Sequence, residues 1–91
     1  MAFAVAAFNR RRQSLDHATF YAETRKIWTG ILRRLQQSGQ LRRDIDPELE
    51  ATTLLCMFDG VGVHAAIDPG RLNAKRQRAI LEAYFQKLVR E

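Results

Sequence analysis

Apolar residues recur every three to four positions over three long stretches of the chain, which is the spacing typical of amphipathic helices. These stretches are residues 16–38, 47–67 and 74–90, and a shorter apolar and then basic run predicts another helix over residues 2–12. The sequence shows no strand-like alternation, internal repeat or low-complexity segment. The pattern therefore predicts a single all-α domain over residues 1–91, an antiparallel helix bundle of about four helices.

Residues that favour helix ends lie at the boundaries of these stretches. Gly39 follows the helix over 16–38 and can adopt the left-handed conformation that ends many helices. Asp46 is a good N-cap, and Pro47 takes the first helical position, where its missing N–H costs nothing. Asn73 can cap the last helix in the same way.

The helix over 16–38 has one strongly apolar and aromatic face, spanning an arc of about 140°. Helical core is the plainer interpretation of such a face. A ligand pocket is the sharper one, because pockets are mainly apolar with a few polar atoms, and three residues of this face carry both. The candidate pocket residues are His17, Phe20, Tyr21, Trp28 and Ile31.

The two later helices have more apolar surface than one neighbour can cover. The helix over 47–67 has two apolar stripes on roughly opposite sides, and that over 74–90 has an apolar arc of about 180°. Gly60 and Gly62 each cost about 1 kcal/mol relative to Ala inside a helix, which favours close packing of another backbone against them. A chain of 91 residues buries too little surface to cover both helices, so we expect a homodimer.

Fifteen Lys and Arg against ten Asp and Glu leave a formal charge of +5, which permits nucleic acid as a partner. The basic residues are nevertheless spread along the chain, as they are on solvated helix faces. The tight junctions join helices of about twenty residues, and their apolar arcs leave no exposed recognition helix. The charge and the helix pattern therefore do not predict a DNA-reading module in these residues.

Cys56 is the single cysteine, which excludes an internal disulfide and a cysteine-based metal cluster and fits a reducing, cytoplasmic setting. The apolar run at the N-terminus has no basic region before it and is too short to span a bilayer, so we expect no targeting signal and no membrane partner.

Cys56, Asp59 and His64 lie within nine residues, yet they do not form a credible active site. On a helix they point in diverging directions, and a zinc site needs more ligands than they supply. Gly60 and Gly62 lie inside a helix, whereas a dinucleotide-binding loop joins a strand to a helix. We expect no enzymatic activity, no metal and no cofactor.

The junction between the second and third predicted helices carries a distinctive run, from Gly39 to Glu48, of the form G-x-L-R-x-D-x-D-P-E. An apolar helix with Asp59-Gly60 at its centre and a Pro-terminated end follows. In this order and spacing, residues 15–90 resemble the C-terminal regulatory domain of TetR-family transcriptional repressors.

The resemblance implies a bacterial, cytoplasmic, all-helical homodimer that binds a small hydrophobic effector in its C-terminal domain. It also implies that the last two long helices of each subunit meet their copies in a four-helix interface. Carried over to this sequence, the dimer residues are Leu54, Phe58, Val61, Ile80, Tyr84, Phe85 and Leu88. The candidate pocket residues of the helix over 16–38 then line the effector site.

The helix-turn-helix of the family is absent from these residues, so the chain resembles a fragment or a gene product that starts at an internal Met. DNA contact then requires a domain outside this chain. Two other functions stay open: a small helical protein that dimerises with itself or with a full-length relative and blocks it, and a small basic nucleic-acid-binding protein.

Overall fold

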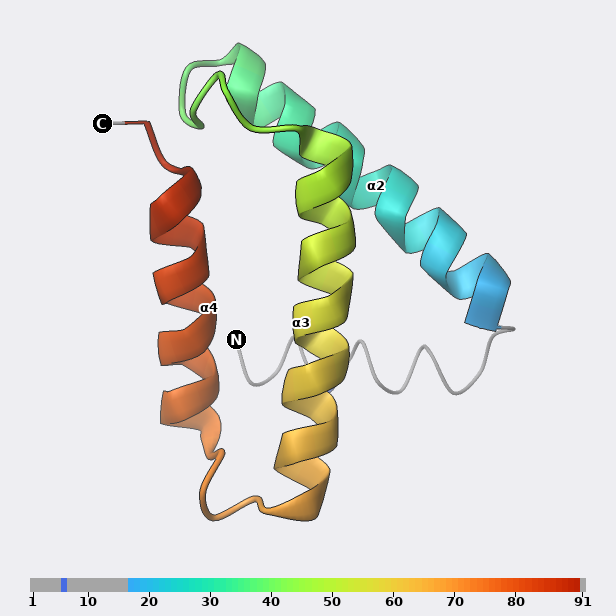
Figure 1. The fold of residues 1–91 in the computed structure, drawn as a ribbon, viewed down its shortest axis with the longest axis vertical. Helices are drawn as coiled ribbons and strands as arrows, with labels where there is room; N and C mark the ends of the chain where they lie inside the picture. The colour runs from blue at the N-terminus through green and yellow to red at the C-terminus, as the bar shows by residue number, and fades with distance from the viewer. Residues whose placement is uncertain (1–5, 7–16, 91) are drawn as a thin grey trace.

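The computed structural model describes Ala6 and residues 17–90. Three helices lie in this part: α2 over His17–Gln37, α3 over Pro47–Ile67 and α4 over Ala74–Leu88 (Figure 1). The prediction of an all-helical fold is confirmed. The helix expected over 2–12 lies outside the described residues except at Ala6, so a bundle of four helices stays a prediction.

Helix α2 crosses the first half of α3 obliquely, and α4 runs antiparallel to α3 on its other side (Figure 1). One hydrophobic core joins the three helices, and Phe20 of α2 and Leu81 of α4 are its largest fully buried side chains. The remaining core residues are Leu32, Leu41, Ala51, Leu54, Leu55, Phe58, Val61 and Leu88.

The turn between α2 and α3 is built as its residues predict. Gly39 has a φ of 85°, a left-handed conformation that favours glycine, and it follows the last turn of α2. The Asp46 side chain accepts a hydrogen bond of 3.1 Å from the Glu48 amide, and Pro47 begins α3. The Gln36 amide nitrogen donates to the carbonyl of Ile45 at 2.9 Å, so α2 itself holds the turn closed.

Helix α4 begins as expected but ends earlier than residue 90. The Asn73 side chain accepts from the Arg76 amide at 3.0 Å and caps its start. At the other end Val89 is extended and forms an isolated antiparallel bridge with Leu41. The amide of Arg42 donates to the Leu88 carbonyl at 2.9 Å, so the α2–α3 turn takes an acceptor that a continuing helix would use.

Candidate dimer interface and effector-binding face

Helix α3 has a buried side and an exposed apolar side. The buried side faces the core with Ala51, Leu54, Leu55, Phe58 and Val61. The exposed side carries a row of six residues that alternate in steps of four and three, which we call the outer stripe of α3: Leu49, Thr53, Cys56, Gly60, Val63 and Ile67. Steps of four and three keep side chains in line along a packed helix seam.

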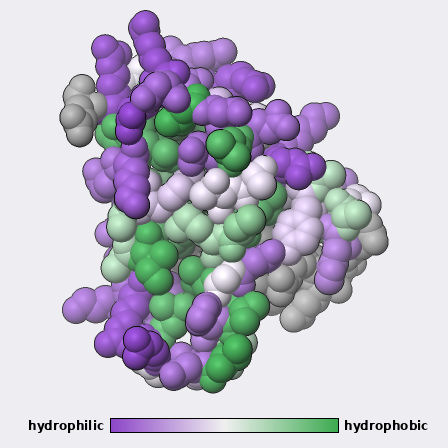
Figure 2. All heavy atoms as spheres, in the orientation of Figure 1, coloured by the Kyte–Doolittle hydropathy of each residue, from purple (hydrophilic) through white to green (hydrophobic). Residues whose placement is uncertain are grey.

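The large residues of this stripe are far from covered. Leu49 is 60% exposed, Val63 49% and Ile67 77%. The face of the molecule shown in Figure 2 carries hydrophobic side chains over its middle and lower parts, with hydrophilic side chains gathered above them. Exposed aliphatic side chains that lie together are a common feature of interaction surfaces.

Helix α4 presents a narrower outer stripe with the same spacing: Arg76, Ile80, Ala83 and Lys87. Its centre is apolar, with Ile80 41% exposed, and each end carries a cation. The opposite side of α4 packs into the core through Leu81 and Leu88.

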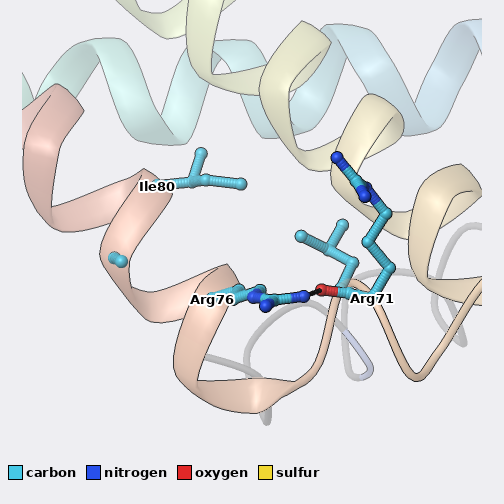
Figure 3. Close-up of a pocket in the computed structure, with 5 residues that line it drawn as sticks. Arg71, Arg76 and Ile80 are labelled. Carbon is cyan, nitrogen blue, oxygen red and sulfur yellow. Dashed lines mark hydrogen bonds between the residues drawn. The ribbon is translucent and has the colours of Figure 1, made fainter.

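An open groove lies between the second half of α3 and the first half of α4, with a volume of about 390 Å³. It is lined by Met57, Gly60, Val61, His64, Asp68, Arg71, Leu72 and Ile80. A hollow of about 350 Å³ shares three of these residues and extends the groove over Arg76 and Ala79 of α4. In Figure 3 the Arg76 guanidinium lies along the turn, where it donates to the backbone carbonyl of Arg71, and Ile80 projects into the hollow.

The structure places the predicted dimer residues in three different environments. Leu54, Phe58, Val61 and Leu88 are buried in the core of the single chain. Tyr84 and Phe85 are half-buried, and Ile80 is exposed. Among the seven, Ile80 is the one with an exposed side chain.

The outer stripe of α3 holds residues that the sequence reasoning assigned to no interface. The sequence contained a sign of this surface, because Cys56, Val63 and Ile67 form the second apolar stripe of this helix. Periodicity alone does not show which of two stripes faces the core. Gly60 and Gly62 are both half-buried, unlike the fully buried residues on the core side of α3. A Cβ built on Gly60 meets no atom within 4 Å, so the described part of the chain packs nothing closely against this glycine.

The five candidate pocket residues lie along α2 in different environments. Phe20 is 1% exposed, and the Trp28 ring packs on Phe58 with centroids 5.1 Å apart. The Tyr21 hydroxyl donates to the carboxylate of Asp59 in α3. His17 and Ile31 are exposed.

None of the three hollows described here is lined by these candidate pocket residues. The hollow on α2 lies on another side of the helix, has a volume of about 700 Å³ and is lined by Glu23, Lys26, Ile27, Gly30 and Arg34.

A hydrogen bond between Tyr84 and Glu50 ties α4 to the first half of α3. The hydroxyl donates to Oε1 of Glu50 at 2.5 Å, and the Glu50 carbonyl lies 3.3 Å away. Burial, together with the negative charge of Glu50, raises the pKa of Tyr84 above its usual value. The phenol is therefore a donor throughout the physiological range.

Cys56, Asp59 and His64 are not brought together as a catalytic group. Cys56 and His64 are exposed, whereas Asp59 is half-buried and engaged by Tyr21. Over residues 17–90 the structure holds no cluster of three or more His, Cys, Asp or Glu side chains that could bind a metal ion.

A model of the BetI-type transcriptional repressor C-terminal domain matches residues 1–90. The chain belongs to the TetR family of transcriptional regulators. It corresponds to the C-terminal domain, which confirms the resemblance found in the Gly39–Glu48 junction.

A curated relative of this TetR-family domain is the HTH-type transcriptional regulator PksA of Bacillus subtilis (strain 168). The two are 27% identical over 92 residues, which cover 98% of this chain and 43% of PksA. The chain therefore spans less than half the length of that regulator. No solved structure matches it significantly.

The helices described for this TetR-family domain do not include one long and apolar enough to cross a membrane. The family is one of transcriptional regulators, and its C-terminal domain is the part present here.

Proposed function

We propose that this chain is the regulatory and dimerisation domain of a TetR-family repressor. Two copies associate through the outer stripes of α3 and α4, and a small hydrophobic effector binds against α2. DNA contact belongs to a helix-turn-helix outside this chain, and the effector acts on it through the shared dimer. The match to a repressor C-terminal family and the name of the relative, an HTH-type regulator, support this role.

The outer stripe of α3 is the observation that carries the proposal. Its aliphatic residues Leu49, Val63 and Ile67 are exposed, although they lie in one row along the 21-residue helix α3. Burying apolar surface yields roughly 25 cal/mol for each Å² removed from water, so a second copy that covers this row gains a large driving force. In a two-fold symmetric dimer, this surface of each copy is covered by the same surface of the other copy.

Dimerisation is tested by placing a charge in the middle of the stripe. We expect Val63→Asp to convert the chain from dimer to monomer in light scattering, because an aspartate there must be desolvated without a partner. Ile27→Asp is the matched control, since Ile27 is also an aliphatic residue exposed on a helix but lies outside both stripes. A wild-type chain that is monomeric at micromolar concentration contradicts the proposal.

Effector binding is proposed at the face that holds His17, Phe20, Tyr21, Trp28 and Ile31. Aromatic surface and a few polar atoms suit an apolar ligand with one or two polar groups. Trp28 is the single tryptophan, so its fluorescence reports on this face without interference.

The test uses the apolar dye 1-anilinonaphthalene-8-sulfonate, which accepts energy from a nearby tryptophan. We expect saturable loss of Trp28 emission, weakened by Ile31→Asp. Ala22→Asp is the control, because Ala22 is exposed and lies nine residues before Ile31, on the opposite side of α2. Equal binding by wild type and Ile31→Asp argues against the site.

A further inference from the structure

We infer that the groove between α3 and α4 binds an amphipathic anion, a small molecule with a carboxylate at one end and an aliphatic body. The carboxylate lies at the turn between the two helices, against Arg71 and Arg76, and the aliphatic body lies along the groove toward Met57. This site is separate from the effector face proposed on α2, because the groove and the hollow that continues it share no lining residue with that face.

The apolar part of the groove is built by one face of α3 together with the turn and α4. Met57 and Val61 lie four residues apart on α3, which is one turn of helix, and Gly60 between them adds no side chain. Leu72 of the turn and Ile80 of α4 complete this lining. The volume of about 390 Å³ lies within the range of small-molecule sites.

The charged part of the groove lies at the turn. His64, Asp68 and Arg71 line the groove there, and Arg76 lines the hollow that continues it. Over residues 60–81 the chain has four Lys or Arg and one acid, Asp68. This end of the groove therefore carries net positive charge next to apolar surface, which suits a ligand with an anionic head group.

Hydrogen bonds hold the turn in the conformation that the site needs. Oδ1 of Asp68 accepts from the Arg71 amide at 3.1 Å, and the buried Gln77 side chain donates to the Leu72 carbonyl at 3.0 Å. The Arg76 guanidinium donates to the Arg71 carbonyl at 2.5 Å, which uses one of its five N–H groups. In Figure 3 the Arg71 side chain extends from the turn toward α3. Two guanidinium groups at one end of a groove can form strong, charge-assisted hydrogen bonds with a carboxylate.

A cationic or a neutral ligand fits this groove less well. A cation is repelled by Arg71 and Arg76, and Asp68 is the one acid of residues 60–81 that could pair with it. A neutral apolar molecule gains the apolar contacts but covers the guanidinium groups without pairing them, which costs free energy.

The ligand and the proposed dimer use two residues in common. Gly60 belongs to the outer stripe of α3 and Ile80 to that of α4, and both line the groove. A second copy that covers the stripes and a ligand that fills the groove compete for this surface, so bound ligand lowers the fraction of dimer. This consequence rests on the proposed dimerisation, whereas the site itself does not.

Titration calorimetry of the full chain with octanoate at pH 7 tests the site. We expect saturable binding that Arg71→Glu weakens about tenfold or more, because a charge-assisted hydrogen bond is replaced by repulsion. Arg78→Glu is the matched control, since it makes the same change of charge at an exposed position of α4 that lines neither part of the groove. Circular dichroism should show both variants folded. Equal binding by the two variants overturns the inference.

Two further ligands test the two halves of octanoate. Octan-1-ol has the same chain without the charge, and butanoate has the charge with a shorter chain. We expect each to bind about tenfold more weakly or less tightly still, because the first loses the charged contact and the second loses buried methylene groups. Octan-1-ol that binds as tightly as octanoate contradicts recognition of an anion, and butanoate that does so contradicts the apolar groove.

The variant Ile31→Asp separates this site from the effector face proposed on α2. Octanoate binding should be the same in Ile31→Asp as in wild type. If Ile31→Asp abolishes binding and Arg71→Glu does not, octanoate binds at the α2 face, which overturns this inference and supports the proposed effector site.

Light scattering with and without saturating octanoate tests the competition with a second copy. We expect the mean mass of wild type to fall toward that of the monomer, and no fall for Arg71→Glu at the same octanoate concentration. A dimer that stays intact with octanoate bound overturns the competition. A chain that is monomeric without octanoate instead contradicts the proposed dimerisation, and the titrations alone then decide the site.

Discussion

Tyr84 provides a polar link between α4 and α3, and Tyr84→Phe removes it without changing the shape of the ring. The lost bond is the one to Oε1 of Glu50 at 2.5 Å. Hydrogen bonds to charged groups contribute about 1.5–3 kcal/mol when protected from water. Both residues here are half-buried, so water partly replaces the hydroxyl as a donor. We therefore expect a loss near the bottom of that range.

For a chain of this size, each kcal/mol corresponds to a fall in melting temperature of about 4–8 °C. Circular dichroism of wild type and Tyr84→Phe at one fixed protein concentration measures this difference, because dimerisation makes the melting temperature depend on concentration.

The pH dependence of the difference tests the same bond. Burial and Glu50 raise the pKa of Tyr84 in the folded chain above the usual value near 10. The folded state then keeps its proton when the unfolded state loses it. The stability from Tyr84 is fully present below pH about 10 and declines as the pH rises through that value towards the folded pKa.

We expect the gap between wild type and Tyr84→Phe to be constant from pH 7 to 9 and to shrink in more alkaline buffer. Tyr21 is the other tyrosine, so in a Tyr21→Phe chain the ultraviolet absorbance change on ionisation reports Tyr84 alone. A gap that widens above pH 10, or a folded-state titration of Tyr84 at or below pH 10, refutes the reasoning.

Two further changes test the turn and the start of α3. Gly39→Ala should lower the free energy of unfolding by about 1–2 kcal/mol in urea, because Gly39 has a φ of 85°, and an unchanged midpoint would contradict this. Asp46→Ala should cost about 1 kcal/mol through loss of the cap on α3, whereas Asp44→Ala, which removes an exposed partner of Arg42, should change the urea midpoint little.

The ends of the helices were predictable because local chemistry sets them. The Asp46-Pro47 start, the Asn73 cap and the Gly39 conformation each depend on residues within one helical turn. The early end of α4 was not predictable in this way. It depends on Leu41, 48 residues away in the sequence, whose strand-like backbone pairs with Val89.

The candidate surfaces were predictable only in part, for a related reason. Helical periodicity identifies two apolar stripes on α3 but not the neighbour that covers each. Leu54 and Phe58 are buried in the core, where Trp28 of α2 packs on Phe58, whereas Val63 and Ile67 are exposed. The assignment of a stripe to core or to surface therefore depends on tertiary packing, which no single helix encodes.

The link between α2 and α3 gives the proposed function a physical route from effector to dimer. Tyr21, on the face proposed for the effector, donates to Asp59 in α3, and the next residue along α3 is Gly60. A ligand that competes for the Tyr21 hydroxyl changes what holds Asp59 in place. Gly60 belongs to the outer stripe of α3, the surface proposed for dimerisation. Coupling between effector binding and dimerisation requires that the effector bind two states of the dimer with different affinities.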